Sequence, residues 1–253
     1  MTEAVLEPTI WDVPKPDISH IITEDDKPVD NLFSERQMHL LTNSLYASWS
    51  GPGEERSFVA MANVGLFFAP HEDPVVPDVL VSLDVRPPAD IWPKHHRSYF
   101  IWEYGKPPEV AIEIVSNRKG GELGHKLHTY ARIGVAYYIV YDPDEQLGNK
   151  VLRVYERRRT TYVEMAEYWL GDMNIGLTLW DGEFEGVQAT WLRWCDDDGQ
   201  VLLTGEEAAQ RERQRAEQER QRAEQERQRA EQEQQRAERL VAQLRALGIE
   251  PEV

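Results

Sequence analysis

The chain of 253 residues can hold one sizeable domain with an appendage, and a hydrophobic fraction of 41% is sufficient for a packed core. No apolar run approaches the length of a bilayer-spanning helix, and the acidic start lacks the basic region that opens a secretory signal, so we expect neither. A net charge of −17 argues against strong non-specific binding to nucleic acid, since proteins that neutralise phosphates usually present a basic surface.

Residues 1–32 are rich in Pro, Asp and Thr and show no hydrophobic periodicity, which predicts an extended arm before a folded domain over residues 33–200. Within that domain we predict a helix that begins at Ser34, its N-cap, with Gln37 as the capping-box partner. Glu35 lies in the first turn of this helix. It either compensates the helix dipole or serves as an accessory acid that holds a second metal or a water.

Several β-strands are predicted next. Residues 58–62 and 64–68 are expected to pair as antiparallel strands, and a strand opened by Asp78 follows them. Residues 86–98 are predicted to be an insertion, and residues 99–104 are compatible with one more strand.

The next predicted strand, residues 108–116, carries a carboxylate inside an apolar run. Glu113 lies among Val, Ile and Ala side chains, and burying it is costly unless it is paired, protonated or bound to a cation. If the Asp78 strand is its neighbour, both carboxylates lie within reach of one cation, because adjacent strands run about 4.8 Å apart. Asp78, Glu113 and the backbone carbonyl of Ile114, with waters, would then form a Mg²⁺ site, with Mn²⁺ as a possible substitute.

An amphipathic helix is predicted over residues 122–133. Its expected buried face consists of Leu123, Leu127 and Tyr130. Two interpretations of Lys126 stay open. It forms a surface ion pair with Glu122, four residues earlier, or it has a functional role as a cation.

Residues 136–141 form a near-continuous apolar run, which predicts a central strand buried on both faces. A strand, a helix and a strand in this order imply a crossover between parallel strands. Residues 151–155 and 161–165 are predicted to form a hairpin, and three shorter β segments follow within residues 177–195. The tryptophans of this last region favour an aromatic core over a base-stacking platform.

From residue 201 to residue 253 the sequence predicts a charged helix with a seven-residue repeat, Arg-Gln-Arg-Ala-Glu-Gln-Glu. Alanine occupies one heptad core position, but glutamate occupies the other until Leu240, whereas strong coiled coils need both to be apolar. We therefore expect a solvated helix held by Arg–Glu pairs, with a seam for a partner only near its end. That seam consists of Leu240, Leu244, Leu247 and Ile249. The region from Gly205 holds 10 Arg and 12 Glu, which leaves 18 basic and 33 acidic residues in residues 1–204, so most of the acidity lies before the C-terminal helix.

The ordered motifs of the folded domain resemble the Uma2 family, also known as DUF820, of the PD-(D/E)xK nuclease superfamily. They are residues 76–79, residues 112–116, Lys126 with Tyr130, and residues 134–143. The resemblance covers about residues 30–195 and implies an α/β fold similar to restriction endonucleases, with a mixed β-sheet core flanked by helices. The long C-terminal α-helix follows this core. The superfamily has Lys two residues after the Glu, where this chain has Val115, and the resemblance assigns that role to Lys126.

The resemblance implies a Mg²⁺-dependent endonuclease that hydrolyses phosphodiester bonds in nucleic acid, with DNA as the expected substrate. Its catalytic residues would be Asp78, Glu113 and Lys126, with Glu35 and Ser116 as secondary candidates. The alternative is a catalytically silent protein of nuclease fold that acts as a dimerisation or regulatory module through its C-terminal helix.

The acidity of the domain and the missing Glu-x-Lys pattern favour this alternative somewhat, and a homodimer or a helix partner is the contact it would need. Cys195 is the single cysteine, which excludes an internal disulfide. A reducing cytoplasm is therefore the expected compartment.

Overall fold

The structure, a computed structural model, describes residues 17, 31–53, 56–117 and 120–246. The chain divides into two compact units, Met1–Thr204 and Gly205–Val253, and each is described by itself. Within the described ranges, no helix is long and apolar enough to cross a membrane. The predicted arm over residues 1–32 falls almost wholly outside these ranges.

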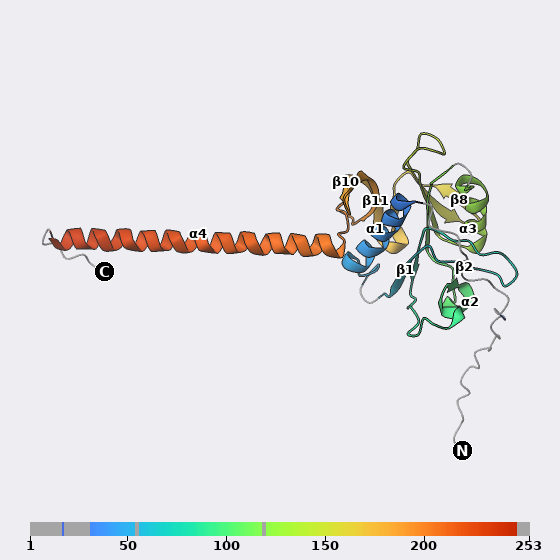
Figure 1. Ribbon diagram of the computed structural model, residues 1–253, viewed down its shortest axis with the longest axis horizontal. Coiled ribbons are helices and arrows are strands. Elements are labelled where there is room, and N and C mark those ends of the chain that lie inside the picture. Colours follow the sequence, from blue (N-terminus) through green and yellow to red (C-terminus); the bar gives the residue numbers. More distant parts are fainter. Residues whose placement is uncertain (1–16, 18–30, 54–55, 118–119, 247–253) are drawn as a thin grey trace, which may run out of the picture. The chain divides into compact units, whose positions relative to one another are not determined.

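The first unit is built on a six-stranded sheet with the strand order β1-β3-β5-β6-β7-β8 (Figure 1). β5 and β6 are parallel, and the other neighbouring strands are antiparallel. The strands are β1 Phe58–Ala62, β3 Val79–Leu83, β5 Val110–Ile114, β6 Tyr137–Tyr141, β7 Leu152–Arg158 and β8 Thr161–Glu164. This mixed sheet, with helices packed on it, confirms the predicted α/β fold class.

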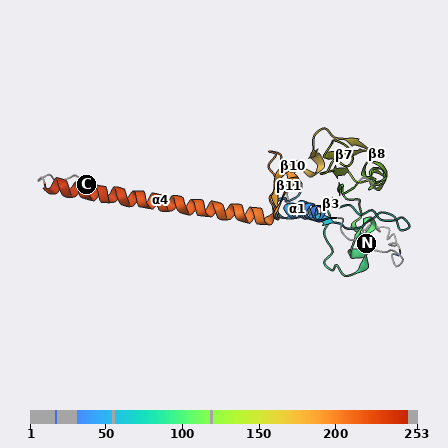
Figure 2. The ribbon, with the colours of Figure 1, turned by 45° about the horizontal axis from the view of Figure 1, so that its top comes forward.

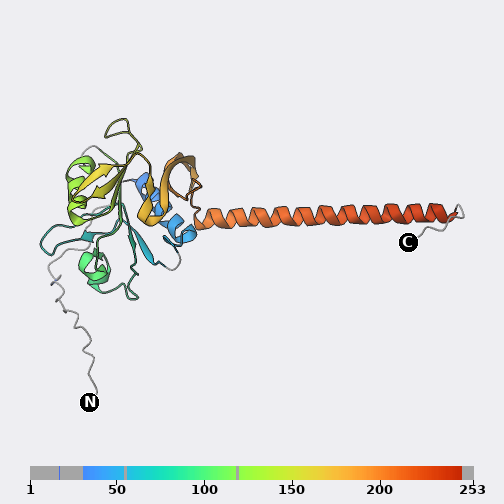
Figure 3. The ribbon, with the colours of Figure 1, turned by 180° about the vertical axis from the view of Figure 1, so that it is seen from behind.

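A helical crossover joins β5 to β6. It consists of a π-helical turn, η2 (Glu122–Lys126), and helix α3 (Leu127–Ile133). α3 lies beside β8, as Figures 1 and 3 show from opposite sides. All five residues of β6 are buried, which confirms the central strand predicted from the apolar run.

The sheet buries a separate hydrophobic core on each face, because successive side chains of a strand point to opposite sides. On one face, helix α1 (Leu32–Ser48) packs Met38, Leu41 and Leu45 against alternate strand residues that include Ile112. On the other face, Tyr130 of α3 packs against the remaining set, which includes Ala111. Glu113 follows the alternation of Ala111 and therefore points to the α3 face.

A three-stranded sheet with the order β11-β10-β9 follows in the chain. Its elements are β9 Trp169–Leu170, the 3-10 turn η3 Gly171–Met173, β10 Ile175–Phe184 and β11 Val187–Cys195. β10 and β11 form one long hairpin where we predicted three shorter segments. Trp191 and Trp194 are fully buried, and Trp194 Nε1 donates to the Leu41 carbonyl oxygen at 3.0 Å, so they belong to the core. Figure 2 shows β11 beside α1.

The start of α1 differs from the prediction. The N-cap is Asn31, whose side-chain oxygen accepts from the Ser34 main-chain N–H at 2.8 Å, so Ser34 lies inside the helix. Gln37 is not a capping-box partner. Its buried amide group instead bonds both the carbonyl oxygen and the N–H of Leu192 in β11, at 2.8 and 3.0 Å. The capping rule considers only residues close in sequence, so it cannot predict a partner 155 residues away.

The predicted pairing of residues 58–62 with residues 64–68 is wrong. β2 (Leu66–Phe67) pairs in parallel with β4 (Tyr99–Phe100), while β1 pairs with β3. The Asn63 N–H donates to the Asp78 carbonyl oxygen at 2.9 Å, so the chain continues the β1–β3 ladder instead of folding back.

The predicted strand over residues 99–104 is present only in part, as β4. The structure turns after Phe100 into the short helix α2 (Ile101–Tyr104), which ends at Gly105 with a φ of 78°. The insertion before β4 contains the 3-10 turn η1 (Lys94–His96).

The second unit is helix α4, Gly205–Ala246, which confirms the predicted long C-terminal helix. None of its side chains is buried, and ion pairs three residues apart lie along it, such as Arg220 with Glu217. The seam residue Leu240 is half exposed. Leu247 and Ile249 lie outside the described residues.

Candidate functional site

The strand register brings the two predicted carboxylates together. β3 and β5 pair with Val79 opposite Ile112, so one further step places Asp78 opposite Glu113. Opposite residues of an antiparallel pair point to the same face. The Asp78 carboxylate is fixed at the end of β5, because its Oδ2 accepts from the Ile114 main-chain N–H at 2.6 Å.

Glu113 is a buried carboxylate with a partner for each oxygen. Its side chain is only 3% exposed, Oε2 accepts from Lys126 Nζ at 2.8 Å, and Oε1 accepts from the Tyr130 hydroxyl at 2.7 Å. Burial raises the pKa of Glu113 to about 7, with the Lys126 charge opposing the shift and the Asp78 charge adding to it. Glu113 therefore changes its charge close to neutral pH.

Lys126 lies among carboxylates at the end of the π-helical turn. Its Nζ donates to Glu113 and lies 3.4 Å from Glu122 Oε1. Burial lowers the pKa of Lys126, but the charges of Glu113, Glu122 and Asp78 outweigh it and hold the pKa above its ordinary value. Lys126 is thus a fixed cation, and we call Asp78, Glu113, Glu122 and Lys126 the charged cluster.

The structure bears on the first interpretation of Lys126, the ion pair with Glu122, and the catalytic interpretation stays a prediction. The pair with Glu122 does form, but Glu122 is buried, so it is not a surface ion pair. Leu123, predicted to be buried, is 38% exposed.

The reason is that this segment is a π-helical turn, in which the Lys126 N–H bonds the Gly121 carbonyl oxygen five residues back. The wider turn changes which side chains face the sheet. Glu122 takes the inward position that an α-helical period assigns to Leu123.

The Glu122 carboxylate occupies space that a side chain at position 120 would fill, and Gly120 has none. A Cβ atom at Gly120 would lie 1.8 Å from Glu122 Oε1, whereas one at Gly124, in the same turn, would meet nothing within 4 Å. We expect Gly120→Ala to lower the free energy of unfolding by about 1–2 kcal/mol, because a buried carboxylate must move. Gly124→Ala should match or exceed the wild type by up to about 1 kcal/mol. Urea unfolding compares them, and equal stability of the two variants would contradict a fixed position of Glu122.

Of the two secondary candidates, Glu35 belongs to α1 and Ser116 follows the strand that carries Glu113. Glu35 is exposed in the first turn of α1, and the apolar residues of α1 pack on the face of the sheet opposite Glu113. Ser116 follows β5 and its hydroxyl accepts from the Asn117 side chain at 3.2 Å. For Ile114, it is the main-chain N–H that contacts Asp78. The catalytic roles of Glu35 and Ser116, and the Ile114 carbonyl as a ligand, stay predictions.

Sequence reasoning missed two members of the site. Tyr130 was assigned to the core, yet its hydroxyl holds Glu113, and its spacing of four residues from Lys126 was the signal for a shared face. Glu122 was treated as a surface residue. Its main-chain oxygen accepts from the buried Tyr138 hydroxyl at 3.1 Å, which fixes the turn against β6.

The charged cluster has the donor chemistry for a hard cation. Glu122 Oε2 is buried and has no hydrogen-bond partner in the described part of the chain, and the Asp78 and Glu113 charges are close enough to interact. Within that same part, no three His, Cys, Asp or Glu side chains are arranged as a ready-made metal site. Mg²⁺ is commonly held by one or two carboxylates, with water and substrate phosphate in the other positions. Asp78 and Glu113 therefore fit this ion.

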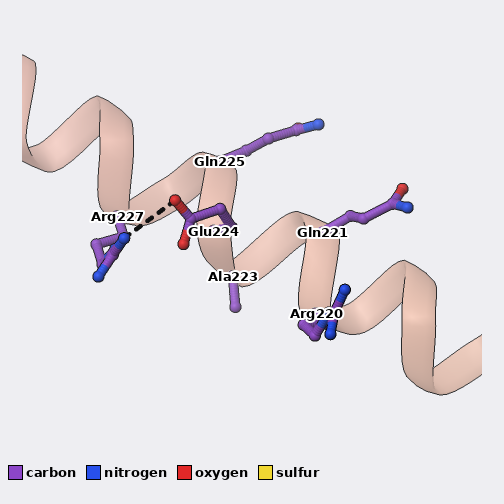
Figure 4. A pocket seen from close by; sticks show the side chains of 6 residues that line it. All are labelled: Arg220, Gln221, Ala223, Glu224, Gln225 and Arg227. Carbon is purple, nitrogen blue, oxygen red and sulfur yellow. Dashed lines mark hydrogen bonds and ion pairs between the residues drawn. The ribbon is translucent and has the colours of Figure 1, made fainter.

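A recess on α4 is a different kind of feature. It is lined by Arg220, Gln221, Ala223, Glu224, Gln225 and Arg227, all from one helix. Figure 4 shows their side chains extending outward from the helix, with Glu224 and Arg227 paired. All six residues come from the surface of a single helix, so we place the candidate site in the charged cluster.

A family model matches the domain that contains the charged cluster. The model is described as "Uma2: Putative restriction endonuclease" and matches residues 16–180. This range includes the whole six-stranded sheet and the crossover with Lys126. No curated protein matches the chain.

Proposed function

The chain belongs to the Uma2 family, and from this premise we propose that its folded domain is a nuclease that uses Mg²⁺ to hydrolyse phosphodiester bonds, with DNA as substrate. The observation that carries the proposal is the meeting of Asp78, Glu113 and Lys126, which are far apart in the sequence, at one end of one sheet face. Two carboxylates beside a lysine suit a reaction that needs a cation and a phosphate at the same place.

Each residue of the charged cluster has a proposed role. Asp78 and Glu113 would hold Mg²⁺, with Mn²⁺ as a substitute, and the bound ion would stabilise the negative charge that develops on the phosphate. Lys126 keeps its proton because its pKa is raised, so it offsets phosphate charge and orients water instead of removing a proton. Tyr130 fixes the orientation of the Glu113 carboxylate.

Cleavage should depend on pH through Glu113, because a protonated carboxyl group cannot hold a cation. With a pKa of about 7, we expect metal-dependent cleavage to rise with pH and to pass its midpoint near 7. The Tyr130 hydroxyl donates to the charged form and lowers this pKa, so Tyr130→Phe should move the midpoint up by about one unit. The measurement is kcat/KM against pH at subsaturating Mg²⁺.

Tyr138→Phe is the matched control for this shift. It removes an equally buried hydroxyl that donates to the main-chain oxygen of Glu122 and not to a carboxylate. The pH midpoint of kcat/KM for Tyr138→Phe should equal that of the wild type. A Tyr130→Phe profile that coincides with the wild-type profile would show that Glu113 does not govern the pH dependence.

The family match supports the nuclease over the silent interaction module. Helix α4 remains a proposed contact surface for a second copy or another helix, because the described part of its seam, Leu240 and Leu244, is not buried. A reducing cytoplasm stays the proposed compartment, based on the single cysteine.

The proposal is tested by incubating the protein with single- and double-stranded DNA and RNA in Mg²⁺, in Mn²⁺ and in EDTA. Calorimetry in parallel measures metal binding, which a silent interaction module does not need at Glu113. A protein that neither binds these ions nor cuts any of the substrates would contradict the nuclease.

A further inference from the structure

We propose that the insertion, residues 86–98, is a strand-binding element, at which an unpaired base stacks on Trp92 and neighbouring phosphates contact basic side chains. This inference rests on the proposed nuclease function and deepens it, because it names unpaired nucleic acid as the substrate class. The observations that carry it are the exposure of Trp92, the hollow beside it, the local charge, and the position of the hollow near Asp78.

Trp92 is 75% exposed, and its neighbour Ile91 is also exposed. The Trp92 side chain lines a hollow with mostly apolar walls. The lining residues are Met61, Val64, Ile91, Trp92, His96, Arg97 and Ser98. An aromatic wall with cationic residues at its edge is the arrangement by which proteins bind single strands, since every base has a face that can stack.

The main chain around Trp92 is held in place. The Trp92 N–H donates to Asp90 Oδ1 at 3.0 Å, and Arg97 Nε donates to the Trp92 carbonyl oxygen at 2.9 Å. His96 is bonded to the Asp90 carbonyl oxygen. These bonds order the loop before a ligand arrives, which lowers the entropy cost of binding.

The insertion is a local exception to the acidity of the domain. Residues 86–97 contain Arg86, Lys94 and Arg97 against the single carboxylate of Asp90, while the domain as a whole has far more acidic than basic residues. A polyanion is therefore directed to this segment and repelled by much of the remaining surface. This charge pattern favours a nucleic-acid strand over a protein partner as the occupant.

A second, smaller hollow adjoins the first and shares His96 with it. Its lining residues are Arg86, Pro88, His95, His96, Glu103 and Tyr104. The Tyr104 hydroxyl is buried and makes no hydrogen bond to any described residue, while its ring stacks on Tyr99 with centroids 4.3 Å apart. Because the two hollows share His96, they can serve adjacent parts of one strand.

The hollow lies at the end of the sheet that carries the charged cluster. Met61 lies opposite Leu80 in the β1–β3 register, and both pack into the core on the Glu113 face. Val64 follows Asn63, whose N–H donates to the Asp78 carbonyl oxygen at 2.9 Å. A strand that stacks on Trp92 is thus directed toward the two carboxylates.

The test measures binding without cleavage. A fluorescein-labelled DNA single strand of about 12 nucleotides is titrated with the full chain in EDTA, and fluorescence anisotropy gives Kd. Trp92→Ala is expected to weaken binding about tenfold, and Trp92→Phe, which keeps a stacking ring, to stay within about threefold of the wild type. Two control probes are an abasic strand of equal length and the matching duplex. The wild type should bind each of them with a Kd similar to that of Trp92→Ala for the single strand.

The charge contribution has its own control. Lys94→Ala should reduce the slope of log Kd against log salt by about 0.7, the value expected for one phosphate contact on a single strand. Lys150→Ala removes an exposed lysine that pairs with Glu164 on the β7–β8 side of the sheet, and it should leave the slope unchanged. Unfolding midpoints of the Trp92 variants should equal the wild-type value, because this side chain is 75% exposed.

The outcomes separate this inference from the proposed function. A Trp92→Ala variant that binds within about twofold of the wild type, or a wild type that binds the abasic strand equally or no strand at all, overturns the inference. If Mg²⁺-dependent cleavage then still depends on Glu113, the nuclease stands without the strand-binding element. If binding depends on Trp92 but no cleavage occurs, the strand-binding element stands and the proposed catalysis fails.

Discussion

Replacing Glu113 with Gln is expected to reduce Mg²⁺-dependent cleavage at least about a thousandfold, because the change removes the buried anion that would hold the cation. Gln fits the same space. Its oxygen can accept from Lys126 Nζ, and its amide group can donate to the Tyr130 hydroxyl oxygen, so both observed contacts keep a partner. Loss of activity without loss of the fold is the expected signature of a metal ligand.

The same variant should be more stable than the wild type at high pH. The folded-state pKa of Glu113, about 7, is above its ordinary value of 4.5, so its contribution to stability is fully present below pH 4.5 and is lost as pH rises through 7. Gln does not titrate and escapes this loss. Urea unfolding in EDTA at pH 5 and pH 8 should show a stability difference, Gln variant minus wild type, that increases with pH.

Asp78→Asn and Glu109→Gln complete this experiment. Asp78→Asn should also abolish cleavage. Glu109 directly precedes β5, at the end of that strand away from Glu113, and pairs with Lys106, so Glu109→Gln should lose stability but keep cleavage. If the Glu113 and Asp78 variants together cut as fast as the wild type, the charged cluster is not the active site.

Replacing Lys126 with Met is expected to give the largest loss of stability, about 3 kcal/mol at pH 8, because Glu113 and Glu122 lose their shared cation. This is the low end of the range for a broken buried pair, since the Lys126 side chain is 29% exposed. Without the Lys126 charge the pKa of Glu113 rises above 7, and protonation of Glu113 relieves the strain, so the loss should shrink as pH falls from 8 toward 7. Cleavage should fall by a factor of about 100–1,000.

A double-mutant cycle distinguishes this charge effect from lost packing. Glu113→Gln combined with Lys126→Met should recover part of the stability at pH 8, because only Glu122 then lacks its cation. Lys126→Arg keeps the cation and should retain most of the stability, with weaker cleavage because its planar fork cannot reproduce the ammonium geometry. A Lys126→Met variant as stable as the wild type at pH 8 would contradict the buried pairing.

The sequence predicted the sheet best where the signal is local and strong. Residues 136–141 have an apolar character that only a strand buried on both faces requires, and β6 is such a strand. Glu113 stood out because a carboxylate in an apolar strand needs a partner. The sequence left the adjacency of the Asp78 and Glu113 strands as a condition of the metal site, and the register of β3 and β5 meets that condition.

The errors have non-local or conformational causes. The pairing of β2 with β4 and the bonds of Gln37 to Leu192 are decided by distant segments. The exchange of Glu122 for Leu123 as the inward residue follows from a π-helical turn, which the usual helical period does not anticipate. Tyr130 was predicted to be buried correctly, but burial alone does not reveal that its hydroxyl holds a carboxylate.

The seven-residue repeat of α4 does not define a single position for a partner helix. A helix that aligns with residues 213–233 meets nearly the same side chains again after sliding by one repeat, about 10 Å. Charge pairing along this stretch can therefore hold a partner helix but cannot fix its position along α4. Leu240 takes the heptad position that Glu holds in the repeats and so marks one point on α4. The position of a partner helix is therefore fixed near the C-terminal end of α4 and not along the repeats.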